Sequence, residues 1–353
     1  MAEPPAPLAW RALVVFTTSN RADYVKRCFP HLARACAGDP RLELLVALDG
    51  DDVQTREFCS EWEIPLIYSD AREGVGLSKN RVLESFPEYD FYFFLEDDLE
   101  LLDVSPFITY VELMRAGNIH HMSLFAESEG HDVRGESTVL GHRLVHFGYG
   151  SGEFNAFSRV GLKQVGGWHP TFAQYRRWGH TEHSYRYPRN GLAPAPFNVA
   201  VDLAGACIRH RPPSVTSWTG SVTIDADGIA VPERELMRQE LRHVTLQTLG
   251  RYFVIRPPRS QLTKLASTVA GHDRYPLLGG RAKRSATVDF LVWRAETATN
   301  AADRLRCLVR AAAMQPSNIA LRHLAKAWLM GARRRLAHGL TRQLRRFSRP
   351  TGS

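Results

Sequence analysis

Three adjacent carboxylates follow an unbroken apolar stretch and are the residues of this chain best suited to chemistry. Residues 91–95 read Phe-Tyr-Phe-Phe-Leu, and Glu96, Asp97 and Asp98 come directly after them. An aromatic run without a turn residue predicts a strand that is buried on both faces. Ligands of open α/β sheets bind at the carboxyl ends of strands, and carboxylates there can hold a hard divalent cation that in turn binds phosphate oxygens. The alternative is a strand that runs into a solvated acidic turn.

A second group of polar residues follows the other predicted strands and has the types that bind a nucleotide. The Asp49 carboxylate can accept a hydrogen bond from a base imide or a ribose hydroxyl, and Lys79 and Arg81 can approach a diphosphate. The end of the first predicted strand adds Thr17, Thr18, Asn20 and Arg21. Taken singly, each residue is better explained by turn or cap chemistry. The loop motif Gly74-x-Gly76 lacks the third glycine of a dinucleotide fingerprint.

Glu182 and His183 form a candidate general-base segment. They stand at a predicted helix start, after a loop rich in glycine and tryptophan. A carboxylate there could take a proton, and the neighbouring imidazole could tune or share the transfer. The spacing of Glu182 and Arg186 also fits a simple i, i+4 salt bridge on one helix face.

Alternating strands and helices must position these residues. The pattern predicts strands at 13–18, 42–48, 65–68 and 91–95, with helices between them, and therefore a doubly wound, mainly parallel sheet. The stretch from about 105 to 220 has short apolar runs and predicts an open α/β half built largely of loops. From about 232 onward the pattern becomes helical.

The ordered motifs resemble those of family 2 glycosyltransferases with the GT-A fold. The motifs are Thr17-x-x-Asn20-Arg21, Asp49-Gly50, Gly76-x-x-x-Asn80-Arg81, Leu95-Glu96-Asp97-Asp98, Gly167-Trp168 and Gly179-x-x-Glu182-His183. The resemblance covers residues from about 10 to 215. It implies a GT-A-like, mainly parallel sheet flanked by helices. It also implies an enzyme that transfers a sugar from a nucleotide diphosphate donor with inversion of configuration, usually with Mg²⁺ or Mn²⁺.

The resemblance also implies roles for individual residues. It places nucleotide contacts at Thr17, Asn20, Asp49 and Lys79, and the metal chiefly at Asp98, with Glu96 or Asp97 nearby. Asp97 is also a candidate contact of the nucleotide sugar. A late histidine often completes the metal shell in this fold, and His210 has the best position for it. The base falls in the segment of Glu182 and His183. Because the family commonly has Glu-Asp there, either residue remains a candidate.

Aromatic residues and loops complete the expected acceptor side. Loops at about 147–155 and 212–228 are expected to close over the acceptor. Trp168, Trp178 and Trp218 are candidate platforms for sugar stacking, although core packing is the stronger explanation for Trp168.

Charge is distributed unevenly over the 353 residues. Twelve basic residues and no acidic residue follow Asp303. Because the net charge of the whole chain is only +8, residues 1–303 carry a net negative charge. Apolar residues recur at helical spacing in this tail. It could therefore lie on an anionic membrane surface or pack on the domain with a solvated cationic face. Charge alone does not indicate nucleic acid, since no aromatic-interleaved pattern supports it.

The composition places the chain among cytoplasmic enzymes. Its five cysteines are scattered and form no CxxC pair, which favours free thiols over disulfides or a zinc site. The first residues lack the features of a signal peptide and predict a short disordered leader. We expect a cytoplasmic protein, with the inner face of the membrane as a peripheral location if the tail binds it.

These observations predict a leader at 1–9, a GT-A domain at 10–230 and a helical extension with a basic tail at 231–353. The expected partners are a nucleotide diphosphate sugar, with a UDP-sugar favoured, and a glycan or lipid-linked acceptor in cell-envelope or polysaccharide synthesis. The alternatives are a sugar nucleotidyltransferase, which would release pyrophosphate, and a non-catalytic module that binds nucleotides or glycans.

Overall fold

A computed structural model of the chain describes residues 10–101, 106–125, 127–175, 178–209, 231–257 and 261–268. The chain divides into two compact units, Met1–His272 and Asp273–Ser353, and the second lies outside the described residues. The predicted leader, the basic tail, His210 and Trp218 also lie outside them. Within the described part, no helix combines the length and the apolar character that a membrane crossing requires.

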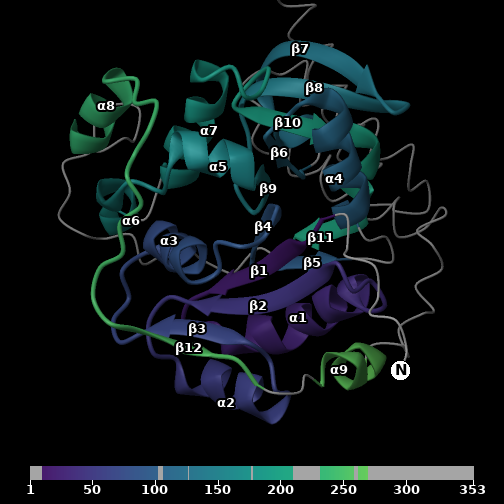
Figure 1. Cartoon of the computed structure of the whole chain (residues 1–353), viewed down its shortest axis with the longest axis vertical. Helices are drawn as coiled ribbons and strands as arrows, with labels where there is room; N and C mark the ends of the chain where they lie inside the picture. Colours follow the sequence, from purple (N-terminus) through teal and green to yellow (C-terminus); the bar gives the residue numbers. More distant parts are fainter. Residues whose placement is uncertain are drawn as a thin grey trace, which may run out of the picture. The chain divides into compact units, whose positions relative to one another are not determined.

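A seven-stranded sheet with the order β12-β3-β2-β1-β4-β9-β6 forms the centre of the described unit (Figure 1). A three-stranded sheet, β10-β8-β7, and a two-stranded sheet, β11-β5, accompany it. The strands are β1 (Ala12–Thr18), β2 (Leu42–Leu48), β3 (Leu66–Ser69), β4 (Phe91–Glu96), β5 (Leu99–Leu101), β6 (His121–Ser123), β7 (His131–Val139), β8 (His142–Tyr149), β9 (Phe154–Ser158), β10 (Phe197–Ala200), β11 (Cys207–Arg209) and β12 (Tyr252–Ile255).

Helices connect and flank these strands. They are α1 (Ala22–Cys36), α2 (Val53–Glu61), α3 (Val75–Ser85), α4 (Pro106–Gly117), α5 (Arg159–Val165), α6 (Pro170–Tyr175), α7 (Gly179–Arg189), α8 (Val231–Arg238) and α9 (Leu262–Thr268), with short 3₁₀ turns η1 (Glu127–Glu129) and η2 (Val201–Ala206).

The predicted fold class is confirmed by the pairing of the first four strands. β3, β2, β1 and β4 are parallel, and the helices between them make the crossovers. All residues of β1 are buried, as are the first five of β4, so apolar side chains cover both faces of the sheet. Separate apolar clusters form on the two faces, one with Phe93 and one with Phe94. The unbroken apolar runs of the sequence therefore correspond to central strands.

The region from about 105 to 220 is more regular than we expected. Its described part contains the long β7–β8 hairpin, strands β6, β9 and β10, and helices α4 to α7. β9 and β6 extend the main sheet in antiparallel orientation. The apolar runs are short because β6, β9 and β10 have only three to five residues and β7 is exposed along its length, so the spacing of apolar residues did not predict these strands.

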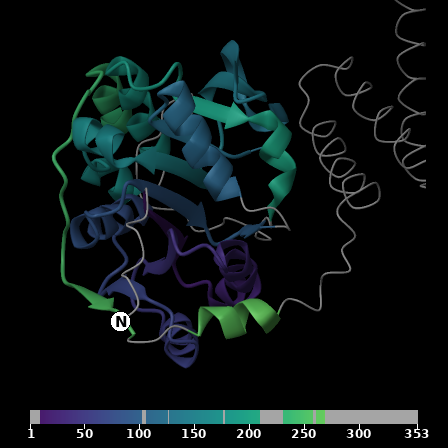
Figure 2. The same ribbon diagram turned by 45° about the vertical axis from the view of Figure 1, so that its right-hand side comes forward.

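The predicted boundary at 230 differs from the arrangement in the structure. β12, which falls in the predicted helical extension, pairs with β3 at the edge of the main sheet, and α9 packs against α1 (Figure 2). The ring of Phe253 on β12 stacks on Tyr68 of β3, with centroids 5.0 Å apart. The described part of the first domain therefore runs to residue 268, because a returning segment completes the sheet.

Candidate functional site

The carboxyl ends of three central strands bring the predicted residues to one edge of the sheet. Thr17 of β1 pairs in register with Glu96 of β4, and Thr18 pairs with Leu48 of β2. The next residues along these strands are the predicted polar ones. The β1 end, Asp49 and the acidic motif therefore lie side by side, as the parallel sheet requires.

The end of β1 binds the middle carboxylate of the acidic motif. The Thr18 hydroxyl donates to Asp97 Oδ2 at 2.7 Å, and the Arg21 guanidinium donates to Asp97 Oδ1 at 2.8 Å. Burial raises the pKa of Asp97, and the Arg21 charge and the Thr18 hydrogen bond act against it. Both oxygens of Asp97 thus serve to hold β1 and β4 together. Asn20, which follows at a left-handed φ of 51°, is exposed.

Lys79 is buried behind the acidic motif. Its side chain is packed between the rings of Trp168 and Phe94, at 5.3 and 5.7 Å from Nζ to the centroids. Burial lowers the pKa of Lys79, and the negative charges of Glu96 and Glu153 oppose that shift. The structure therefore directs this cation toward carboxylates of the protein, whereas we expected it at a diphosphate.

Glu96 faces a second carboxylate that the sequence motifs did not single out. Its backbone N–H donates to the Glu153 carbonyl at 2.8 Å, because β9 begins opposite the end of β4. Burial raises the pKa of Glu96 to about 8. Lys79 lowers it, whereas Glu153, Asp98 and Asp97 raise it further. Only antiparallel pairing brings Glu153 here, and no local pattern predicts such a pairing.

The carboxylates of this motif suit a hard divalent cation in type. Asp97 is occupied by Thr18 and Arg21, which leaves Asp98 and Glu96 as the metal candidates. Mg²⁺ is often held by one or two carboxylates together with substrate phosphates and waters. A cation would also relieve the repulsion that raises the pKa of Glu96. Within the described residues, no three metal-binding side chains gather at one point. His210, the predicted third ligand, lies outside them.

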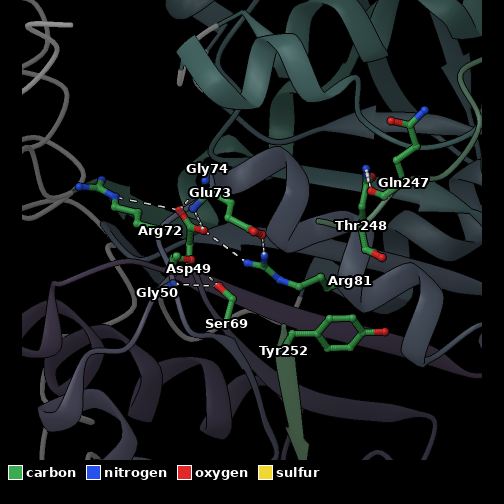
Figure 3. A network of polar contacts seen from close by, with 12 residues as sticks. Asp49, Gly50, Ser69, Arg72, Glu73, Gly74, Arg81, Gln247, Thr248 and Tyr252 are labelled. Carbon is green, nitrogen blue, oxygen red and sulfur yellow. Dashed lines mark hydrogen bonds and ion pairs between the residues drawn. The ribbon is translucent and has the colours of Figure 1, made fainter. Parts of the chain in front are cut away.

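Asp49 organises the loop before α3. Its two oxygens accept hydrogen bonds from the backbone N–H groups of Glu73 and Gly74, both at 2.8 Å (Figure 3). The buried Arg81 guanidinium approaches Asp49 at 3.3 Å and also pairs with Glu73. Arg72 lies on the other side of the carboxylate, at 4.0 Å. Asp49 and Arg81 therefore form an internal network that fixes the turn, and neither projects freely toward solvent.

A glycine is required at the start of this helix. Gly74 has a φ of 104°, which L-residues rarely adopt. A Cβ there would collide with the backbone carbonyl of Ala173. Asn80 fixes the same helix through its side-chain amide. Its Nδ2 donates to the Trp168 carbonyl and, at 2.8 Å, to the Gln247 carbonyl, and its Oδ1 accepts from the Trp168 N–H.

Glu182 forms the salt bridge that its spacing allowed. It is buried in the first turn of α7, and Arg186 Nε donates to its Oε1 at 2.7 Å while Nη2 pairs with Oε2. Arg186 also donates to the carbonyls of Val165 and Gly167. The carboxylate is thus held in one orientation. It retains lone pairs for a further donor, since a carboxylate offers about four acceptor sites.

His183 is fully buried against Trp168. The two rings stack with centroids 4.1 Å apart and an interplanar angle of 16°. His183 Nε2 lies 3.1 Å from the Gly166 carbonyl oxygen, which can only accept, so the hydrogen resides on Nε2. The lone pair is therefore on Nδ1, which has no hydrogen-bond partner among the described residues. Burial and the Arg186 charge hold the pKa of His183 well below its usual value.

The tryptophans differ in their availability. Trp168 is buried and packs edge-on against Phe94 and Phe157, so it is part of the core. Trp178 precedes α7, is partly exposed and has a left-handed φ of 58°. Among the described candidates, Trp178 is therefore the one that a sugar could contact.

Comparison with solved structures finds glycosyltransferases of low sequence identity. The mannosyltransferase PcManGT from Pyrobaculum calidifontis, solved with GDP-Man and Mn²⁺, is 14% identical over 92% of this chain and 86% of its own, with a TM-score of 0.49. Residues 1–349 of S. aureus TarS, solved with UDP-GlcNAc, are 14% identical over 91% of this chain and 92% of that one, with a TM-score of 0.46.

A third structure is the glucosyl-3-phosphoglycerate synthase of Mycobacterium tuberculosis, solved with Mn²⁺, UDP and glucosyl-3-phosphoglycerate. It is 14% identical over 60% of this chain and 79% of its own, with a TM-score of 0.40. No protein-family model and no curated protein sequence matches the chain. All three TM-scores lie below 0.5.

Proposed function

We propose that the protein is a metal-dependent glycosyltransferase that moves a sugar from a nucleoside diphosphate sugar to an acceptor hydroxyl. The observation that carries the proposal is the edge of the sheet where the β1 end, Asp49 and the acidic motif lie side by side. Such an edge is where α/β proteins bind nucleotides. The three similar structures were solved with GDP-Man, UDP-GlcNAc or UDP, which supports the same class of donor.

The acidic motif would hold the donor diphosphate through Mg²⁺ or Mn²⁺. Asp98 and Glu96 are the residues that would bind the cation, and its charge would stabilise the leaving diphosphate. Asp97 positions the motif through Thr18 and Arg21. Arg21 is partly exposed beside this carboxylate, so its remaining donors can reach a phosphate oxygen.

The internal contacts of Asp49 leave room for a hydrogen bond to the nucleobase of the donor. The carboxylate accepts from two backbone N–H groups and from Arg81, and it has capacity for one further donor such as a base imide N–H. A UDP-sugar is therefore the donor that we propose.

The proposed step is a direct displacement at the anomeric carbon. The acceptor oxygen forms a bond to that carbon, the bond to the diphosphate oxygen breaks, and a base removes the hydroxyl proton, so the configuration is inverted. Glu182 and His183 are the candidate bases, at the start of α7. Arg186 fixes the Glu182 carboxylate, and the low pKa of His183 weakens the imidazole as a base, so we favour Glu182. A role in cell-envelope or polysaccharide synthesis follows only from the family resemblance.

Donor binding and product analysis test this proposal. We expect a UDP-sugar with Mn²⁺ to raise the melting temperature, because a ligand at a hundred times its dissociation constant adds about 2.7 kcal/mol. Turnover should release a nucleoside diphosphate. Release of pyrophosphate would identify a nucleotidyltransferase instead, and binding without any turnover would indicate a non-catalytic module.

A further inference from the structure

Tyr149, in the segment 147–155 that we expected to close over the acceptor, pairs with the partly exposed Tyr185. Tyr149 ends β8 and is 45% exposed, and Tyr185 lies on α7, one turn after Glu182. Their ring centroids are 6.1 Å apart, with an interplanar angle of 67°. Burial and hydrogen bonding to Tyr149 raise the pKa of Tyr185 to about 12, so its hydroxyl stays protonated at neutral pH. The pair thus presents an aromatic face with a polar edge.

A charged pair on β7 borders the tyrosines. Arg134 Nε and Nη2 both donate to Asp132 Oδ2, at 3.0 and 2.9 Å. The Arg134 guanidinium carbon lies 5.9 Å from the Tyr185 ring centroid. Both charged side chains are about half exposed. Within the described part of the chain, Asp132 Oδ1 and Arg134 Nη1 have no hydrogen-bond partner, so the pair offers one acceptor and one donor group to solvent.

The backbone leaves room for this ion pair over β8. Asp132 has a left-handed φ of 58°, a conformation that aspartate adopts more readily than most residues other than glycine. The pair lies directly over Gly148, the neighbour of Tyr149. A Cβ at Gly148 would collide with the Asp132 carboxylate and lie 2.9 Å from Arg134 Nε. The absence of a side chain at 148 therefore leaves room for the ion pair, whose arginine lies over the Tyr185 ring.

A short, tightly packed loop connects this surface to the proposed catalytic edge. Tyr149 precedes Glu153 by four residues, which span at most about 14 Å. The Glu153 carbonyl accepts from the Glu96 N–H. The loop is fixed along the way, because Gly152 packs against the His180 ring of α7 so closely that a Cβ would lie 2.6 Å from it. A short oligosaccharide could reach from the tyrosines to the acidic motif.

We propose that Tyr149, Tyr185, Asp132 and Arg134 form a carbohydrate subsite for the acceptor. A pyranose has an apolar face of C–H groups, which suits an exposed aromatic ring, and a rim of hydroxyls that donate and accept hydrogen bonds. Tyr149 supplies the ring, whereas Arg134 and Asp132 supply a donor and an acceptor. The ion pair is neutral overall, and Arg189 adds a cation whose guanidinium carbon lies 5.5 Å from the Tyr185 ring centroid. The subsite rests on the proposed function, because it serves a glycan acceptor whose reacting hydroxyl lies at Glu182.

Binding of sugars without donor tests the subsite. The full chain is applied to a printed array of bacterial and mammalian glycans, and the dissociation constant of the strongest binder is measured by calorimetry. We expect Tyr149→Ala and Arg134→Gln to weaken binding at least tenfold. Tyr149→Trp, which keeps the stacking surface, should stay within a few fold of the wild type.

Matched controls come from the same hairpin. Leu140→Ala removes a side chain that is 62% exposed at the hairpin turn. Arg143→Gln removes an arginine paired with Glu136 on the neighbouring strand. Both controls should bind glycans like the wild type, and melting curves of all variants confirm folding. If no glycan on the array binds, or if Tyr149→Ala binds as tightly as Leu140→Ala, the subsite is wrong.

The two proposals fail separately. If glycans bind through Tyr149 but no nucleotide sugar raises the melting temperature, the glycosyltransferase proposal fails and the carbohydrate subsite stands. If a UDP-sugar binds with Mn²⁺ and turns over while the glycan array stays blank, the subsite fails and the proposed function stands.

Discussion

At the scale of single residues, the carboxylates of the proposed site differ in their contacts with the rest of the protein. Both oxygens of Asp97 accept hydrogen bonds, from Thr18 and Arg21. Both oxygens of Asp49 accept hydrogen bonds from backbone N–H groups of the loop before α3. Asp98 sits in the turn after β4, beside Glu96 and Asp97, and is the residue that we assign to the metal. Mutations at the two kinds of carboxylate should therefore have different consequences.

We predict that Asp98→Asn abolishes sugar transfer while the protein stays folded. Loss of the charge should weaken metal and donor binding together. Asp39→Asn is the matched control, because Asp39 pairs with Arg41 before β2, at the opposite end of the strands. Activity of both variants is measured at sub-millimolar Mn²⁺. Turnover of Asp98→Asn close to that of the wild type would contradict the metal assignment.

We predict that Glu182→Gln lowers the transfer rate by roughly 10²–10⁴-fold, the contribution of one general base. His183→Ala should lose less and show a shifted pH profile. Arg186→Gln also breaks the ion pair but keeps the Glu182 carboxylate, so its rate shows how much of the loss comes from the missing ion pair alone. Rates are compared well below the melting temperature of each variant. If His183→Ala loses more than Glu182→Gln, the base is His183. If all three variants keep full activity, the segment is structural.

At the scale of elements, the start of α3 depends on contacts from three other parts of the chain. The Asp49 carboxylate accepts from the two backbone N–H groups just before the helix, Gly74 packs against the backbone of Ala173, and the Asn80 amide donates to the carbonyls of Trp168 and Gln247. Lys79 and Arg81 therefore point where this framework directs them, and both are buried. Helical propensity of residues 75–85 does not explain these contacts.

We predict that Asp49→Asn destabilises the protein without any ligand, by about 1–3 kcal/mol, since it leaves a buried N–H group and Arg81 poorly satisfied. Asp52→Asn is the comparison. Asp52 caps α2 by accepting from the Gln54 N–H, and asparagine is as good a cap as aspartate, so little change is expected. Urea unfolding of both variants gives the free energies. An Asp49→Asn protein that is as stable as the wild type but fails to bind a UDP-sugar would instead assign Asp49 to the nucleotide alone.

At the scale of the whole molecule, several buried histidines make stability depend on pH. His121 stacks on Phe157 with centroids 4.7 Å apart, and burial and the charge of Lys79 lower its pKa from 6.5 to about 4. His180 and His183 also have lowered pKa values. Between pH 6.5 and 4 the unfolded chain binds protons that the folded protein does not. The histidines therefore contribute stability above pH 6.5 that is lost as the pH decreases.

We predict that His121→Gln reduces the loss of stability between pH 7 and pH 5 by up to roughly 2 kcal/mol, because each unit of pKa shift corresponds to about 1.4 kcal/mol. The quantity to compare is the change in unfolding free energy between the two pH values, so a general destabilisation by the mutation cancels. His131→Gln, which removes an imidazole at an exposed position on β7, is the variant to compare with it. An equal loss in His121→Gln and wild type would contradict the assignment.

The sequence alone determined the central sheet and the residues at its edge. Residues 44–48 and 91–95 are apolar without interruption, and a strand covered on both faces requires such a run. Parallel strands bring their carboxyl ends to one edge, so the gathering of Thr18, Asp49 and Glu96 followed from the order of the elements. These features depend on local composition and simple topology.

Only the tertiary structure decided how each of those residues is used. Glu153 faces Glu96 through the antiparallel pairing of β9, and β12 joins the sheet from a part of the chain that we expected to be helical. Lys79 looked like a phosphate ligand but is enclosed by two aromatic rings. Burial, ion pairing and hydrogen bonding depend on residues distant in sequence, and these set whether a charged side chain binds a ligand or holds the protein together.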